Sequence, residues 1–162
     1  SYKGKCLSAH NVHRANHSAP DIQWDDGLAS TAAKIAATCN YAHNTEMDGG
    51  GYGQNIAAGI KPEHVDAVIT NLFYNSEVSA FDGNYGQANP SSNFESWGHF
   101  TQVVWKASGQ VGCATQDCSS QGLANAGGGV PAFFTVCNYK SPGNFAGEYD
   151  KNVGRPLGHP TV

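Results

Sequence analysis

The sequence predicts a single domain that combines α-helices with a β-sheet, and three observations support this α+β class. Apolar residues recur at helical spacing in the first half of the chain, whereas two strand-like apolar segments occupy 110–115 and 132–139. The 162 residues suffice for one compact domain, and no internal repeat or linker divides them. Helices at the front and strands at the back therefore indicate layers of helix and sheet around a shared core.

Three helices are expected in the first half. The first covers about 3–16 and ends before the turn-forming "HSAPD". The second begins after Asp25 or Asp26, either of which can cap it, and its apolar stripe consists of Leu28, Ala32, Ile35 and Ala36. The third opens with a proline at a position that a helix tolerates, and its apolar face consists of Val65, Val68, Ile69 and Leu72.

The remaining segments are expected to be mostly irregular. The glycine-rich stretch at 43–55 predicts a loop, with "GGGYGQN" as a turn, and residues 78–96 predict a long polar-aromatic loop. The stretch "FTQVVW" at 100–105 fits a helix or a strand. We expect a flexible connection at 119–129 and an extended C-terminal tail from about residue 141.

Composition excludes some classes of function and favours an oxidising compartment. The formal net charge is −4 with only nine Lys and Arg residues, which argues against a nucleic-acid partner, and no run is long enough to span a membrane. None of the five cysteines forms a C-x-x-C pair, so two disulfides and one odd thiol are favoured over a zinc ribbon, with buried free thiols as the alternative. The chain begins without an apolar signal region, so it is either intracellular or preceded by a removed signal, and the cysteines favour secretion. The sequon at Asn16 would suit a secreted glycoprotein.

Histidines supply the candidate chemistry. His99 stands between a glycine and an aromatic residue, next to an apolar run, and His43 lies in another loop. If the two imidazoles met across a cleft and Glu77 joined them, the set would suit Zn²⁺ or another divalent cation with one open position. A second set, His10, His13 and His17, shares one helical face, where a solvated flank is favoured over a metal site. No G-x-S-x-G or H-E-x-x-H motif occurs.

Several ordered motifs resemble those of the CAP superfamily, which comprises cysteine-rich secretory proteins, antigen 5 and pathogenesis-related class 1 proteins. The strongest are "GHFTQVVW" at 98–105 and "VGCA" at 111–114. "HNVHR" at 10–14, "GQNIA" at 53–57 and "CNYKSPGN" at 137–144 agree in order. The resemblance covers nearly the whole chain and is greatest to the fungal secreted members.

The resemblance implies a fold and a site. The fold is a three-layer α-β-α sandwich with a central, mainly antiparallel sheet, formed by one domain over 1–162. A cleft in this fold carries four residues, which correspond here to His43, Gln54, Glu77 and His99. Gln54 replaces the commoner glutamate, and an amide carries no charge and cannot act as a general base. The resemblance also implies two disulfides, Cys39–Cys118 and Cys113–Cys137, which leave Cys6 free or able to cross-link a second chain.

The resemblance further implies a secreted, extracellular lipid-binding protein that binds or exports sterols, and possibly fatty acids, at a host or cell surface. The sterol site is expected at the aromatic loop, through Phe81, Tyr85, Phe94 and Trp97; the alternative is that these rings only anchor the loop. Fatty acids are expected between helices. The other functions considered are a metal-dependent hydrolase that uses the cleft histidines, and a host-interaction effector or defence-type protein with a cell-surface partner.

Overall fold

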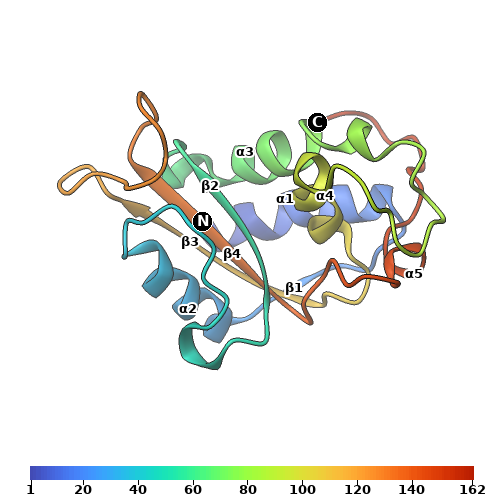
Figure 1. The fold of residues 1–162 in the computed structure, drawn as a ribbon, viewed down its shortest axis with the longest axis horizontal. Helices are drawn as coiled ribbons and strands as arrows, with labels where there is room; N and C mark the ends of the chain where they lie inside the picture. The colour runs from blue at the N-terminus through green and yellow to red at the C-terminus, as the bar shows by residue number, and fades with distance from the viewer.

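A four-stranded sheet forms the centre of the protein, for which a computed structural model describes all residues 1–162 (Figure 1). The strand order is β1-β3-β4-β2. The short β1 (Gln23–Trp24) pairs in parallel with β3 (Gln110–Asp117). The long β4 (Phe133–Lys140) is antiparallel both to β3 and to β2 (Gly53–Ala58). The sheet is therefore mainly antiparallel, with β2 at one edge.

Helices cover both faces of this sheet. On one face α2 (Asp26–Ala36) packs against β3 and β4, and the Asp25 side chain caps the helix by accepting from Leu28 N at 2.8 Å. On the other face lie α1 (Tyr2–Asn16), α3 (Val65–Ala67) and α4 (Phe94–Val104), as Figure 1 shows. Each face has its own buried apolar cluster. The predicted α+β class and three-layer sandwich are thus confirmed. None of the helices combines the length and the apolarity that a bilayer span requires.

The histidines of α1 correct one expectation. His10, His13 and His17 are almost completely buried, so neither a solvated flank nor a metal site describes them. His10 and His17 use both ring nitrogens on protein partners: His10 bonds Cys6 O and Tyr139 Oη, and His17 bonds Gly154 O and Tyr74 Oη. His13 bonds Thr70 Oγ1 at 2.8 Å. Burial lowers the pKa of His10 and of His13 to about 4, because the charged ring would lose its hydration.

The third predicted helix is wound differently from the expectation. It consists of a 3₁₀ turn, η2 (Pro62–His64), then α3, then a π-helical segment, η3 (Val68–Asn75). The backbone hydrogen bonds of η3 run from residue i to i+5, so each later side chain points in a different direction from the one it would have in an α-helix. Leu72, predicted to face the core, is consequently 38% exposed, whereas Phe73 is buried.

Other elements were absent from the sequence prediction. β2 begins at Gly53, inside the segment read as a turn, and a Cβ at Gly53 would collide with the Gln102 side chain. The aromatic loop contains a short helix, η4 (Val78–Phe81), and another, η1 (Met47–Gly49), lies in the glycine-rich loop. The stretch at 100–105 is helical up to residue 104. The tail is not simply extended: it contains α5 (Tyr149–Asn152), where Tyr149 packs edge-on against Trp97 and Trp105.

Two disulfides are present, with the pairing that the family resemblance implies. Cys39–Cys118 joins the segment after α2 to the end of β3, and Cys113–Cys137 joins directly opposite residues of β3 and β4. Cys6 is a free thiol with no exposed surface, and burial raises its pKa to about 12. A cross-link from Cys6 to a second folded chain is therefore excluded.

The sequon residue Asn16 is engaged within the fold. Its Nδ2 donates to Tyr74 Oη at 3.1 Å, and its Oδ1 accepts from the backbone N–H groups of Leu157 and His159. A glycan on Nδ2 would displace the bond to Tyr74. Glycosylation at this position stays a prediction that these contacts do not favour.

Candidate functional site

Glu77 fixes the orientation of His99. The carboxylate lies just after η3, and its Oε1 accepts from the backbone N–H groups of His99 and Phe100, at 2.9 and 3.1 Å. Its Oε2 accepts from His99 Nδ1 at 2.6 Å. Phe73 stacks on the imidazole, with 5.1 Å between ring centroids and 5° between planes. In the neutral ring Nδ1 therefore carries the proton and Nε2 is an acceptor, and no protein group bonds to Nε2.

Gln54 fixes the orientation of the His43 imidazole, as Glu77 fixes that of His99. The Asn44 backbone N–H donates to Gln54 Oε1 at 3.1 Å, and Gln54 Nε2 donates to Asn44 O at 2.8 Å. These two backbone contacts determine which end of the amide is oxygen. His43 Nδ1, 2.9 Å from Oε1, must therefore be protonated. The side chain at 54 thus orients an imidazole without supplying a charge, and it leaves His43 Nε2 without a protein partner.

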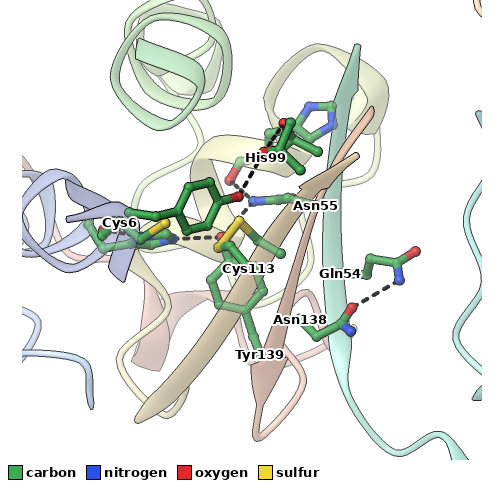
Figure 2. The surroundings of a disulfide bond; sticks show 12 residues. Cys6, Gln54, Asn55, His99, Cys113, Asn138 and Tyr139 are labelled. Atoms are coloured by element: carbon green, nitrogen blue, oxygen red, sulfur yellow. Dashed lines mark hydrogen bonds between the residues drawn. A yellow bond between two sulfur atoms is a disulfide. The ribbon is translucent and has the colours of Figure 1, made fainter. Parts of the chain in front are cut away.

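The two histidines meet across the edge of the sheet. Side chains alternate along β2, so Gln54 lies on the face that α2 covers and Asn55 on the opposite face (Figure 2). Asn55 Nδ2 donates to His99 O at 3.2 Å and to Tyr139 Oη at 3.3 Å. His43 and His99 both line one pocket of about 240 Å³ at this edge. The structure thus brings together the four residues that the family resemblance implies, with Glu77 held behind His99.

Four residues of this pocket were not singled out from the sequence: Asn55, Glu95, Gly98 and Asn144. Besides Asn55, Asn144 lines it and holds α4 in place by donating to Gly98 O at 3.0 Å. Gly98 itself leaves room for the ring of Phe94, because a Cβ at this position would meet that ring at 2.7 Å. Asn144 and Gly98 belong to the motifs "CNYKSPGN" and "GHF", but a motif does not show which of its residues face a ligand.

The residues present do not fit a zinc site. Both oxygens of Glu77 and the amide oxygen of Gln54 already accept hydrogen bonds. Two imidazole Nε2 atoms remain, whereas catalytic zinc takes three protein ligands and structural zinc takes four. No group of three or more His, Cys, Asp or Glu side chains in the chain is arranged to hold a metal ion.

The aromatic residues of the loop divide into two groups. Phe81 and Trp97 are buried in the main core, packed edge-on against each other, and Tyr85 packs on Phe81. Phe94 is 50% exposed, packs edge-on against Trp97 and lines the pocket. Of the four side chains predicted to contact lipid, Phe94 alone lines this pocket, and Tyr85 is half-buried.

Comparison with known proteins assigns the family. The model of the CAP family, described as the cysteine-rich secretory protein family, matches residues 7–139. The chain belongs to this family. Pathogenesis-related protein 1A of Nicotiana tabacum is 33% identical over 88% of this chain and 76% of that protein.

Fungal members of the family are similar over nearly all of this chain. A probable pathogenesis-related protein of Arthroderma benhamiae is 53% identical over 99% of the chain and 51% of its own length. Secreted protein RBT4 of Candida albicans is 34% identical over 92% of the chain and 37% of its own length. The chain thus spans about half or less of these fungal relatives.

Solved structures of the family share the fold. A structure described as NaASP2 with Zn²⁺ aligns with a TM-score of 0.73 at 20% identity, over 95% of this chain and 86% of that one. MpPR-1i aligns with a TM-score of 0.52 at 22% identity, over 91% and 93%. At these identities the comparisons support the fold alone.

Proposed function

We propose that this CAP protein is a secreted lipid-binding protein whose cleft takes a sterol, with fatty acids as a second class of ligand. Secretion is supported by two disulfides, which persist in oxidising compartments. It is also supported by the similarity to a fungal relative that is named as a secreted protein.

One observation carries the proposal: the half-exposed ring of Phe94 lines a pocket whose other lining residues are mainly polar. The ring packs over Gly98, so it offers a flat apolar face, and the pocket below contains His43 and His99. A flat hydrocarbon with a single hydroxyl group matches this combination, because the ring system can stack on Phe94 while the hydroxyl reaches an imidazole.

The buried aromatics support this surface from below. Trp97 contacts Phe94 edge-on, with centroids 5.3 Å apart, and Phe81 contacts Trp97 at 5.1 Å. Replacing Phe81 or Trp97 by alanine would cost about 3–5 kcal/mol of stability through the cavity left in the core. A binding test must therefore use Phe94.

The test is sterol binding by Phe94→Ala, with Phe145→Ala as the matched control. Phe145 is 55% exposed and does not line the pocket. We expect Phe94→Ala to weaken ergosterol binding about tenfold, since a partly buried ring contributes about 1.5 kcal/mol. Phe145→Ala should bind like the unmodified protein. Equal affinity of Phe94→Ala and the unmodified protein would remove this surface as the sterol site.

The cleft favours lipid binding over zinc-dependent hydrolysis. The cleft does not hold the donor set that a zinc hydrolase requires, and Gln54 is a neutral amide. No residue of the structure identifies a cell-surface receptor.

A further inference from the structure

An apolar groove adjoins the cleft that contains His43 and His99. Its volume is about 280 Å³, and eight of its ten lining residues are apolar. One wall is residues 56–58 of β2, and the other is Leu72 and Phe73 of η3. Tyr41, Ala126 and Val130 complete the lining. His99 is the one residue that the groove shares with the cleft.

The π-helical winding of η3 creates the apolar rim of this groove. Val65, Val68 and Ile69 are fully buried, and α-helical spacing would place Leu72 on the same stripe. Instead Phe73 takes the core position and Leu72 is turned into the groove, 38% exposed. Val130, also 38% exposed, lies on the opposite rim. π-Helical turns are rare and occur frequently at functional sites.

The Glu77–His99 pair at the polar end of the groove offers hydrogen-bond acceptors, and the Tyr41 ring carries the only other polar side-chain group of the lining. Glu77 Oε1 already accepts two hydrogen bonds and Oε2 accepts one. In the neutral His99 ring with its proton on Nδ1, Nε2 is an acceptor without a protein partner. A hydroxyl group can donate to it. A carboxylate cannot donate, and it would lie near the negative charge of Glu77.

We propose that this groove binds an aliphatic alcohol, with the hydrocarbon between β2 and η3 and the terminal hydroxyl donating to His99 Nε2. The groove shares His99 with the sterol cleft, but its hydrocarbon contacts on β2 and η3 are separate from Phe94. The two proposals can therefore fail separately.

The first experiment is calorimetric titration with 1-hexanol, 1-octanol and 1-decanol at pH 7.5. Affinity should rise by up to about fourfold for each methylene, because one buried methylene contributes about 0.8 kcal/mol. The ether 1-methoxyoctane, which has no O–H donor, should bind about fivefold more weakly than the alcohol of equal chain length, in line with one hydrogen bond. Octanoate should also bind more weakly than 1-octanol. No binding, affinity independent of chain length, or octanoate binding as tightly as 1-octanol would overturn the proposal.

The second experiment places the ligand with matched variants. Leu72→Ser and Val130→Ser should each weaken 1-decanol binding about tenfold, since each removes apolar contact worth roughly 1–2 kcal/mol. Leu157→Ser and Val12→Ser, at exposed positions that do not line the groove, should leave it unchanged. Phe94→Ala should also leave it unchanged, even if it abolishes sterol binding.

Three results would contradict the assignment. One is equal 1-decanol affinity of Leu72→Ser and Leu157→Ser. Another is amide shift changes in the NMR spectrum that avoid residues 56–58 and 72–73. The third is a dimer of the unmodified protein that Leu72→Ser converts to monomer, which would assign the groove to a second copy of the chain.

Discussion

Replacing Glu77 by glutamine should reverse the protonation of the His99 ring. In the unmodified protein Oε2 accepts from His99 Nδ1 at 2.6 Å, and Oε1 accepts from two backbone N–H groups. An amide at 77 can keep its oxygen on the backbone donors, but its NH₂ group then faces Nδ1. The imidazole must shift its proton from Nδ1 to Nε2 so that Nδ1 can accept.

The cost follows from the three bonds that change. Hydrogen bonds to a charged group contribute about 1.5–3 kcal/mol each and neutral ones about 1 kcal/mol. Loss of the buried charge also removes its desolvation penalty, which offsets part of this difference. We expect Glu77→Gln to lose about 1–2 kcal/mol of unfolding free energy. Glu77→Ala should lose roughly 3–5 kcal/mol, because it leaves buried donors of His99 and Phe100 without a partner.

The assay is ¹⁵N NMR of the histidine side chains together with urea unfolding. In the unmodified protein at pH 8, His99 Nε2 should resonate as a bare ring nitrogen, and in Glu77→Gln as a protonated one. His43 should keep its own tautomer in both proteins, which provides the internal control. An unchanged protonation state of His99 in Glu77→Gln, or stability unaltered in Glu77→Ala, would refute the role given to Glu77.

Three further predictions concern the cleft and the core. Gln54→Glu should destabilise the protein by about 1–2 kcal/mol at pH 7, because a carboxylate oxygen would face Asn44 O. The loss of stability should be smaller at pH 4, where the protonated carboxyl group can donate to Asn44 O. A loss that is the same at both pH values would contradict this. The lowered folded-state pKa values of His10 and His13 predict full stability above pH 6.5 and a decline towards pH 4, by up to about 1.4 kcal/mol per pH unit for each histidine. Urea midpoints that match at pH 7 and pH 5 would exclude this linkage, and His13→Gln should reduce the slope. Replacing both Cys39 and Cys118 by serine removes a disulfide that joins residues 79 positions apart. On the loop-entropy model this should lower the free energy of unfolding by about 4–5 kcal/mol. A decrease below about 1 kcal/mol in calorimetric unfolding would contradict the prediction.

The sequence predicted elements whose local pattern agrees with their tertiary environment. α1, α2, β3 and β4 lie close to their expected bounds, since apolar periodicity and the Asp25 cap need no information from distant residues. β2 was missed because its pairing with β4 and the close approach of Gln102 to Gly53 are tertiary effects. The π-helical winding of η3 likewise has no sequence signal in the apolar spacing.

The candidate site was predicted through motifs rather than through physics. Spacing alone could not show that His43 and His99 lie on either side of the edge strand β2. Nor could it show that His10 and His17 are buried, since their partners Tyr139 and Tyr74 are distant in sequence. For the aromatic loop the sequence predicted too many contact residues. Four rings indicated a binding surface, but two of them, Phe81 and Trp97, are buried in the core.

The central claim is that the protein carries lipid in its cleft, and lipid retained during purification tests it most directly. The protein and Phe94→Ala would each be secreted from a sterol-producing yeast, purified without detergent and analysed by native mass spectrometry with lipid extraction. We predict about one sterol for each molecule of the unmodified protein and much less for Phe94→Ala. Equal, trace amounts of sterol in both proteins, with no other lipid bound, would contradict the account.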